Sequence, residues 1–177
     1  MQTQFHQYLQ RPGLSTFLAA REACLNDMNF DPCTRILDEI ERLTDEEMWS
    51  PAVQAVSDAL PNYLLSPRLH LLAARVSRAM NEHETAEHES DVALALVEGI
   101  LSTGDGSPEA PYLVMRTSDE TDVMMRLGKD VRAKVLRRRN HRDYEVLVAE
   151  DGTQVWFDIT EAYERLTTWP DVIANVS

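Results

Sequence analysis

Two histidines near the middle of the chain have a spacing close to that of a helical zinc site. His83 and His88 lie five residues apart in the segment HETAEH. A zincin helix needs histidines four residues apart, because only that spacing points both imidazoles at one metal ion. A five-residue step turns the second imidazole by ~140° beyond a full helical turn. We therefore expect solvated surface pairs, His83 with Glu87 and Glu84 with His88, and neither a metal ion nor a cofactor.

A glycine-containing turn follows about fifteen residues later along the chain. The run Gly104-Asp105-Gly106-Ser107 lacks the Gly-Lys-Ser/Thr of a phosphate loop and the alternating carboxylates of an EF-hand loop. Its simplest interpretation is an aspartate-led turn. A small-molecule site at this junction stays open as an alternative, since catalytic groups need only be close in space. Its candidate residues are Asp105, Glu109, His88 and Tyr112.

Six cations lie within the eleven residues 132–142. On a strand, Arg137 and Arg139 share one face and Arg138 takes the other, so part of this cluster must lie at an edge or in solvent. A nucleic-acid site would need aromatic stacking partners and a positive overall field, which are both missing, so we expect no nucleic acid. Two interpretations stay open: internal pairing with the acidic half of the chain, or a docking patch for a protein. That patch would comprise Arg132, Arg137, Arg138, Arg139 and Arg142.

Charge is unevenly distributed along the 177 residues, whose net charge is -13. Residues 1–110 carry 7 basic and 18 acidic side chains, whereas residues 111–177 carry 10 and 12. An acidic field repels nucleic acid and anionic membranes and favours a basic protein partner. With no signal-like segment or spanning apolar run, we expect a cytoplasmic protein. Cys24 and Cys33, nine residues apart, are expected to be buried thiols.

Apolar stripes with helical spacing predict about five helices before residue 104. The stripes span residues 15–28, 31–43, 44–60, 66–80 and 84–101. Ser15, Asp31-Pro32 and Ser66-Pro67 are helix-start signals, and residues 44–47 (TDEE) have the capping-box pattern. Residues 1–14 show no sustained periodicity and are expected to form a loose arm. The small residues Ala74, Ala86 and Ala93 are spaced as in a tetratricopeptide hairpin.

The pattern changes to period two after the glycine and proline of residues 104–108. Strands are predicted at residues 112–116, 133–139, 144–149 and 154–159, with the last three in an antiparallel meander. A capping box at residues 117–120 should open a short helix that ends at Gly128, and a last helix should cover residues 160–166. Asp151-Gly152 predicts a two-residue primed turn. The expected fold is α+β: a helical lobe at 15–103 and a small α+β lobe at 104–177 packed on it as one cooperative unit.

Residues 99–114, with the sequence GILSTGDGSPEAPYLV, resemble the bacterial family known as domain of unknown function four-nine-one-nine. Its members likewise place a helix ending in Ile-Leu-Ser before Gly-Asp-Gly, a turn containing Glu, and a strand. The similarity covers residues 86–160. Within this range it continues through an acidic helix to Leu127-Gly128 and then to the strand Trp156-Phe157-Asp158-Ile159. The family has no assigned activity. The resemblance therefore implies a fold and no catalytic residue.

These observations favour an interaction module over an enzyme. Amphipathic helical hairpins form grooves for peptides or helices, and an acidic face selects basic partners. We therefore expect a non-catalytic bacterial protein that binds protein and neither nucleic acid nor membrane. One alternative is an enzyme with a small-molecule site near Gly104-Asp105-Gly106. The other is an acidic inhibitor or immunity-type binder of a basic protein.

Overall fold

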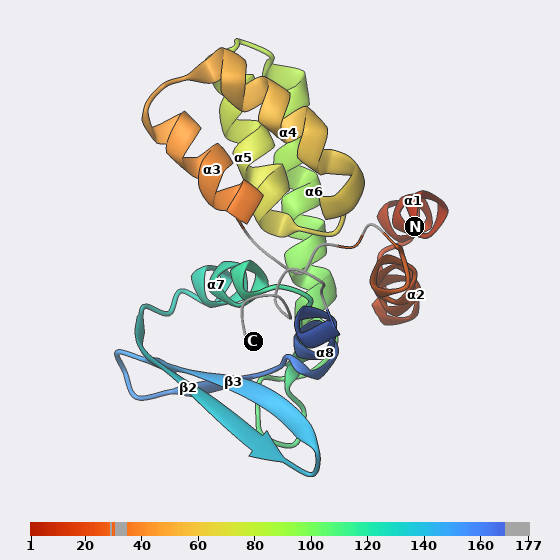
Figure 1. The fold of residues 1–177 in the computed structure, drawn as a ribbon, viewed down its shortest axis with the longest axis vertical. Coiled ribbons are helices and arrows are strands. Elements are labelled where there is room, and N and C mark those ends of the chain that lie inside the picture. The colour runs from red at the N-terminus through yellow and green to blue at the C-terminus, as the bar shows by residue number, and fades with distance from the viewer. Residues whose placement is uncertain (29, 31–34, 169–177) are drawn as a thin grey trace. The chain divides into compact units, whose positions relative to one another are not determined.

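The computed structural model describes residues 1–28, 30 and 35–168. The chain divides into two compact units, Met1–Gly99 and Ile100–Ser177 (Figure 1). The first is helical and the second contains a four-stranded sheet, so the predicted α+β class is confirmed. The helix-start signal at Asp31-Pro32, together with Cys33, lies outside the described residues. Among the helices that are described, none is long and apolar enough to cross a bilayer.

The first unit is built from amphipathic helices. They are α1 (Gln2–Gln10), α2 (Leu14–Leu25), α3 (Arg35–Asp45), α4 (Trp49–Tyr63), α5 (Pro67–Ala79) and α6 (His83–Leu101), whose last two residues belong to the second unit. The helix start predicted at Ser66 is confirmed, because the Ser66 hydroxyl accepts a hydrogen bond from the Leu69 amide at 3.3 Å. Cys24, on α2, is buried, as predicted.

The loose arm predicted at residues 1–14 is wrong, because most of it forms α1. Phe5 and Tyr8 lie on one buried face of this helix. The Tyr8 hydroxyl donates to the backbone oxygen of Ala95 on α6, and the Tyr8 ring packs edge-on against Phe17 of α2 at 5.4 Å. Two apolar residues are too few to reveal a helical period in the sequence. Long-range contacts therefore stabilise α1 where local pattern does not.

The capping box predicted at Thr44 is also wrong. Thr44 lies in the last turn of α3, where its hydroxyl donates to the Glu41 oxygen at 2.7 Å. The chain leaves α3 through Glu47, which has a positive φ of 55°, and the Met48 amide closes back on the Leu43 oxygen at 2.8 Å. This is the C-terminal closure of one helix rather than the start of the next.

The core of the first unit lies between α3, α4 and α5, which pack side by side (Figure 1). Each apolar stripe that predicted these helices supplies one layer of it. The buried core residues are Leu37, Ile40 and Leu43 of α3, Ala52, Val56, Ala59 and Tyr63 of α4, and Leu69, Leu72, Ala73 and Val76 of α5. Burial of each large side chain stabilises the unit by roughly 1.5–3 kcal/mol.

The sheet of the second unit has the strand order β1-β4-β3-β2. Its strands are β1 (Tyr112–Leu113), β2 (Val131–Arg139), β3 (Arg142–Ala149) and β4 (Gln154–Asp158). β2, β3 and β4 form the predicted antiparallel meander, whereas β1 pairs in parallel with β4. Helix α7 (Thr117–Arg126) separates β1 from the meander in sequence, and α8 (Thr160–Thr168) follows β4 and contacts β3.

Three turns around this sheet differ in detail from the expectation. The capping carboxylate of α7 is Asp119, which accepts from the Arg116 amide at 3.0 Å, so the box begins one residue earlier than predicted. The two-residue turn is Asn140-His141, where both φ angles are positive, and it joins β2 to β3. At Asp151-Gly152 only Gly152 has a positive φ, and the Ala149 amide bonds to the Thr153 oxygen across a three-residue loop.

Candidate functional site

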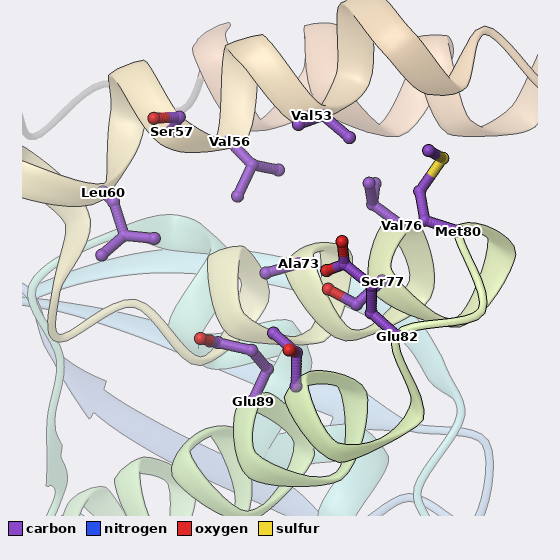
Figure 2. Close-up of a pocket in the computed structure, with 11 residues that line it drawn as sticks. Val53, Val56, Ser57, Leu60, Ala73, Val76, Ser77, Met80, Glu82 and Glu89 are labelled. Atoms are coloured by element: carbon purple, nitrogen blue, oxygen red, sulfur yellow. The ribbon is translucent and has the colours of Figure 1, made fainter.

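A groove in the helical unit runs over α5 between α4 and α6 (Figure 2). Its volume is about 290 Å³. Two helical faces line this groove, and each contributes four residues at positions i, i+3, i+4 and i+7. On both faces the first, second and fourth of these residues are apolar and the third is a serine. These are Val53, Val56, Ser57 and Leu60 of α4, and Ala73, Val76, Ser77 and Met80, the last residue being the C-cap of α5.

The apolar side chains of the groove reach from the core into solvent. Val56 and Val76 are buried to 8% and 3% exposure, whereas Val53 and Met80 remain 43% and 46% exposed. In Figure 2, Val53 and Met80 point toward the same space from opposite helices. The apolar stripes of α4 and α5 therefore extend beyond the residues that the core buries. An exposed apolar strip bounded by polar residues is typical of a binding surface.

Acidic residues form the third side of the groove. Glu82 lies just before α6 and Glu89 lies one helical turn after Thr85, so Thr85 and Glu89 share a face. Glu82 is exposed and makes no ion pair with another described side chain. Glu84 and Glu87, also exposed on α6, add negative charge nearby. An occupant of the groove would meet apolar side chains on α4 and α5 and carboxylates on α6.

A buried histidine orients Glu89 at this groove. His70 of α5 is 3% exposed, and its Nδ1 lies 2.5 Å from Glu89 Oε2. Its Nε2 lies 2.9 Å from the Leu64 oxygen, and a carbonyl can only accept, so Nε2 carries a proton. The ring also stacks on Phe5 at 6.0 Å. With its imidazole held on three sides, His70 joins α5 to α6 and holds one edge of the groove.

The arginine patch lies on the β2–β3 hairpin and is partly paired within its own unit. Arg142 lies 2.7 Å from Asp158, while the distances from Arg138 to Asp143 and from Arg139 to Glu109 are 3.6 and 4.0 Å. Arg132 and Arg137 make no ion pair with any other described side chain. The pairs of Arg138 and Arg139 are largely exposed and contribute only about 0–1 kcal/mol each, whereas the Asp158 carboxylate that meets Arg142 is buried. The cluster therefore leaves cations available on the surface.

The junction residues have separate local contacts. Asp105 accepts a hydrogen bond from the Ser107 amide at 2.9 Å, and hydrogen bonds with Ser107 lower the pKa of its carboxyl. Glu109 is exposed beside Arg139. Tyr112 is buried against Phe157, and burial, followed by the charge of Asp105, raises the pKa of its hydroxyl. His88 is exposed on α6 in the other unit. Asp105 thus forms the aspartate-led turn that its sequence context predicts.

A buried carboxyl pair in the second unit was not predicted from the sequence. Glu120 of α7 is fully buried, and Lys134 of β2 lies 3.0 Å from Glu120 Oε2 and 2.5 Å from Glu145 Oε2 of β3. Burial, then the hydrogen bond and charge of Glu145, raise the pKa of Glu120 from 4.5 to about 9. Burial lowers the pKa of Lys134, but its bonds to both carboxyls outweigh this and the net shift is upward. The sequence signal was weak, because these residues belong to three elements.

No family model, curated protein or solved structure matches this chain. The resemblance of residues 86–160 to the family of unknown function stays a prediction. The sequence held one signal of the groove, the same residue order in the stripes of α4 and α5, but only the structure shows that Val53 and Met80 lie outside the core.

Proposed function

We propose that this protein is a non-catalytic interaction module whose groove over α5 binds an amphipathic helix with a basic flank. The observation that carries the proposal is the pair of matched apolar faces on α4 and α5 beside the carboxylates of Glu82 and Glu89. A helix inserted in such a groove presents apolar anchors at i, i+3 or i+4, and i+7. The same spacing on both walls of the groove suits an occupant with that repeat.

Hydrophobic contact supplies the affinity in this proposal. Val53 and Met80 are about half exposed and already ordered by the helices that carry them. Covering their remaining apolar surface gains ~25 cal/mol per Å², and little conformational entropy is lost on the groove side because the helices are preformed. The serines Ser57 and Ser77 lie between the apolar positions on each wall and let a partner backbone approach closely.

Charge supplies the selectivity. Residues 1–99 carry 7 basic and 16 acidic side chains, and the groove is bordered by carboxylates of α6. A field of this sign raises the association rate of a basic partner and disfavours nucleic acid and anionic lipid. We accordingly place the protein in the bacterial cytoplasm, bound to protein. If the basic partner is an enzyme or a toxin, this protein would act through the same surface as an acidic inhibitor or immunity-type binder.

A pair of designed peptides tests the groove. Each is a fluorescent helix of about 18 residues with leucines at i, i+3 and i+7, one flanked by lysines and the other by glutamates. Fluorescence anisotropy with the full chain should show binding of the lysine peptide and at least about tenfold weaker binding of the glutamate peptide. Binding of the lysine peptide should also weaken as salt is added, because the carboxylates are exposed.

Matched variants locate the binding. Val53→Asp places a charge on the exposed wall of the groove, and Leu94→Asp places one at a similarly exposed apolar residue of α6 that does not line it. We expect Val53→Asp to weaken the lysine peptide by about tenfold or more and Leu94→Asp to leave it unchanged. Equal effects of the two variants, with both folded by circular dichroism, would show that the peptide binds elsewhere and would contradict the proposal.

A further inference from the structure

β2 is an exposed edge of the sheet. In the order β1-β4-β3-β2, β3 lies on one side of it and no described strand lies on the other. Eight of its nine side chains are exposed, and only Val135 is partly covered. A long strand in this position presents unpaired backbone N–H and C=O groups to solvent. β2 can therefore accept a further strand without any change in the sheet.

The hairpin register determines which backbone groups point outward. Arg139 and Arg142 flank the two-residue turn, and in such a hairpin this pair exchanges backbone hydrogen bonds. Bonded pairs alternate along an antiparallel ladder, so Arg137 and Val135 also direct their backbone groups to β3. The residues between them direct theirs to the outer edge. These are Lys134, Leu136 and Arg138.

The side chains beside this edge are cationic on both faces of the sheet. Arg137 and Arg139 share one face, and Arg138 lies on the other with Leu136. Arg137 has no carboxylate partner among the described residues, and Arg138 and Arg139 are 73% and 56% exposed at their side chains. Leu136 is 54% exposed and supplies an apolar surface among these cations. The edge thus combines unpaired backbone, free positive charge and one apolar contact point.

We propose that the outer edge of β2 binds an extended acidic segment of a partner protein by strand addition. Outward backbone groups of Lys134, Leu136 and Arg138 form the ladder with the added strand. Carboxylates at alternate positions of the segment face Arg137 and Arg139, and an apolar side chain on its other face covers Leu136. This surface lies in the second unit and selects the opposite charge from the groove, so the two proposals stand independently.

Charge screening and charge repulsion both favour an acidic segment over other occupants of this edge. The net charge of -13 opposes an acidic partner at long range, but at physiological salt the screening length is ~8 Å, so the groups at the edge decide the contact. There Arg137 has no ion-pair partner among the described residues, and Arg138 and Arg139 lie 3.6 and 4.0 Å from their carboxylates. A second copy of the chain pairing through β2 would bring arginines against arginines, which is unfavourable. The arginines that prevent self-association of the edge are therefore the same groups that would attract a carboxylate-rich strand.

A short peptide provides the probe. A labelled, end-blocked peptide of alternating Glu and Val, about eight residues long, matches the alternation of the edge, and its Lys-Val counterpart is the charge control. Two further Glu-Val peptides carry backbone N-methyl groups on alternate residues. One peptide is methylated at every Glu and the other at every Val, and these are the two methylation phases. Anisotropy with the full chain should show binding of the Glu-Val peptide, loss with one methylation phase and retention with the other, because only one set of N–H groups faces β2.

Substitutions in β2 complete the test. Among the backbone hydrogen-bonding groups, Leu136→Pro removes only one N–H, and this N–H points outward. Edge strands tolerate proline at such a position, so the hairpin should persist while peptide affinity falls by about tenfold or more. Leu136→Thr keeps the N–H and controls for the lost side chain. Arg137→Glu should also weaken binding, whereas Arg42→Glu, on α3, should not.

The outcomes separate strand addition from its alternatives. If Arg137→Glu abolishes binding but N-methylation in both phases and Leu136→Pro leave it intact, the peptide adheres by charge alone and the proposal is overturned. Tighter binding of an oligothymidylate than of the Glu-Val peptide would identify a nucleic-acid surface and overturn it as well. Concentration-dependent dimers that Leu136→Pro dissolves would identify a second copy as the occupant, with the same consequence.

Discussion

The ammonium of Lys134 on β2 lies 3.0 Å from a carboxyl oxygen of Glu120 on α7, a side chain with no exposed surface. The same ammonium lies 2.5 Å from Glu145 on β3. One cation thus holds two carboxyl groups and joins a helix to both strands of the hairpin. Because its side chain is buried, and because Glu145 lies beside it, Glu120 has a raised pKa and retains its proton to higher pH than usual.

Replacement of Glu120 by glutamine should reduce the dependence of stability on pH. The ordinary pKa of a glutamate side chain, which applies to Glu120 in the unfolded chain, is 4.5, and the pKa of Glu120 in the folded protein is about 9. Between these values the folded protein holds a proton that the unfolded chain has lost. The contribution of Glu120 is therefore fully present below its unfolded pKa and is lost as pH rises toward 9. The wild type should lose up to about 1.4 kcal/mol per pH unit from this group, and Glu120→Gln should remove that slope.

Urea denaturation at several pH values between about 5 and 9 measures this effect. Glu150→Gln, at an exposed position, is the matched control and should keep the slope of the wild type. An unchanged slope in Glu120→Gln would mean that Glu120 titrates normally in the folded protein.

Replacement of Lys134 by methionine should destabilise the protein more than the same change at Lys129. Lys129 makes a single bridge of 3.0 Å to Asp151, an exposed carboxylate, and exposed bridges are worth at most about 1 kcal/mol. Lys134 contacts a fully buried carboxyl, but it is itself 43% exposed and partly solvated, so we expect a loss of about 1–3 kcal/mol. Urea unfolding at neutral pH measures both variants.

A double-mutant cycle distinguishes this interaction from general damage. Lys134→Met and Glu120→Gln should be non-additive, with a coupling free energy of about 0.5–2 kcal/mol. Additive effects would show that Lys134 and Glu120 do not interact energetically in spite of their proximity.

Replacement of Gly99 by alanine should destabilise the helical unit although alanine favours helix. An added Cβ would overlap the Phe17 ring and lie 2.7 Å from the Tyr8 hydroxyl oxygen. The gain in helix propensity is about 1 kcal/mol, whereas overpacking costs about 1–3 kcal/mol, so we expect a small net loss and a lower melting temperature. Gly13→Ala, whose added Cβ comes no closer than 4.0 Å to Thr16, avoids this overlap and should lower the melting temperature less, by the preference for glycine over alanine at the N-cap of α2 alone. An equally stable Gly99→Ala would show that Phe17 can move aside.

Local pattern predicted most of the secondary structure. Ser66-Pro67 opens α5, and the stripe with Leu69 and Val76 forms its buried face, because helix starts and amphipathic faces depend on residues a few positions apart. The β2–β3–β4 meander follows from period-two alternation and short connections in the same way. The α+β class could be stated without any coordinates for that reason.

Tertiary contacts decided what local pattern could not. α1 forms because Tyr8 reaches Ala95 and Phe17, which are distant in sequence. The stripe residues Val53 and Met80 look like core in the sequence, and only the packing of α4 on α5 leaves them at a groove. Glu120 reads as an ordinary acidic residue of a first helical turn until the sheet buries it beside Glu145. Burial and charge pairing depend on residues that are close in space but distant in sequence. The sequence alone therefore predicts the helices and strands but not the sites that these elements assemble.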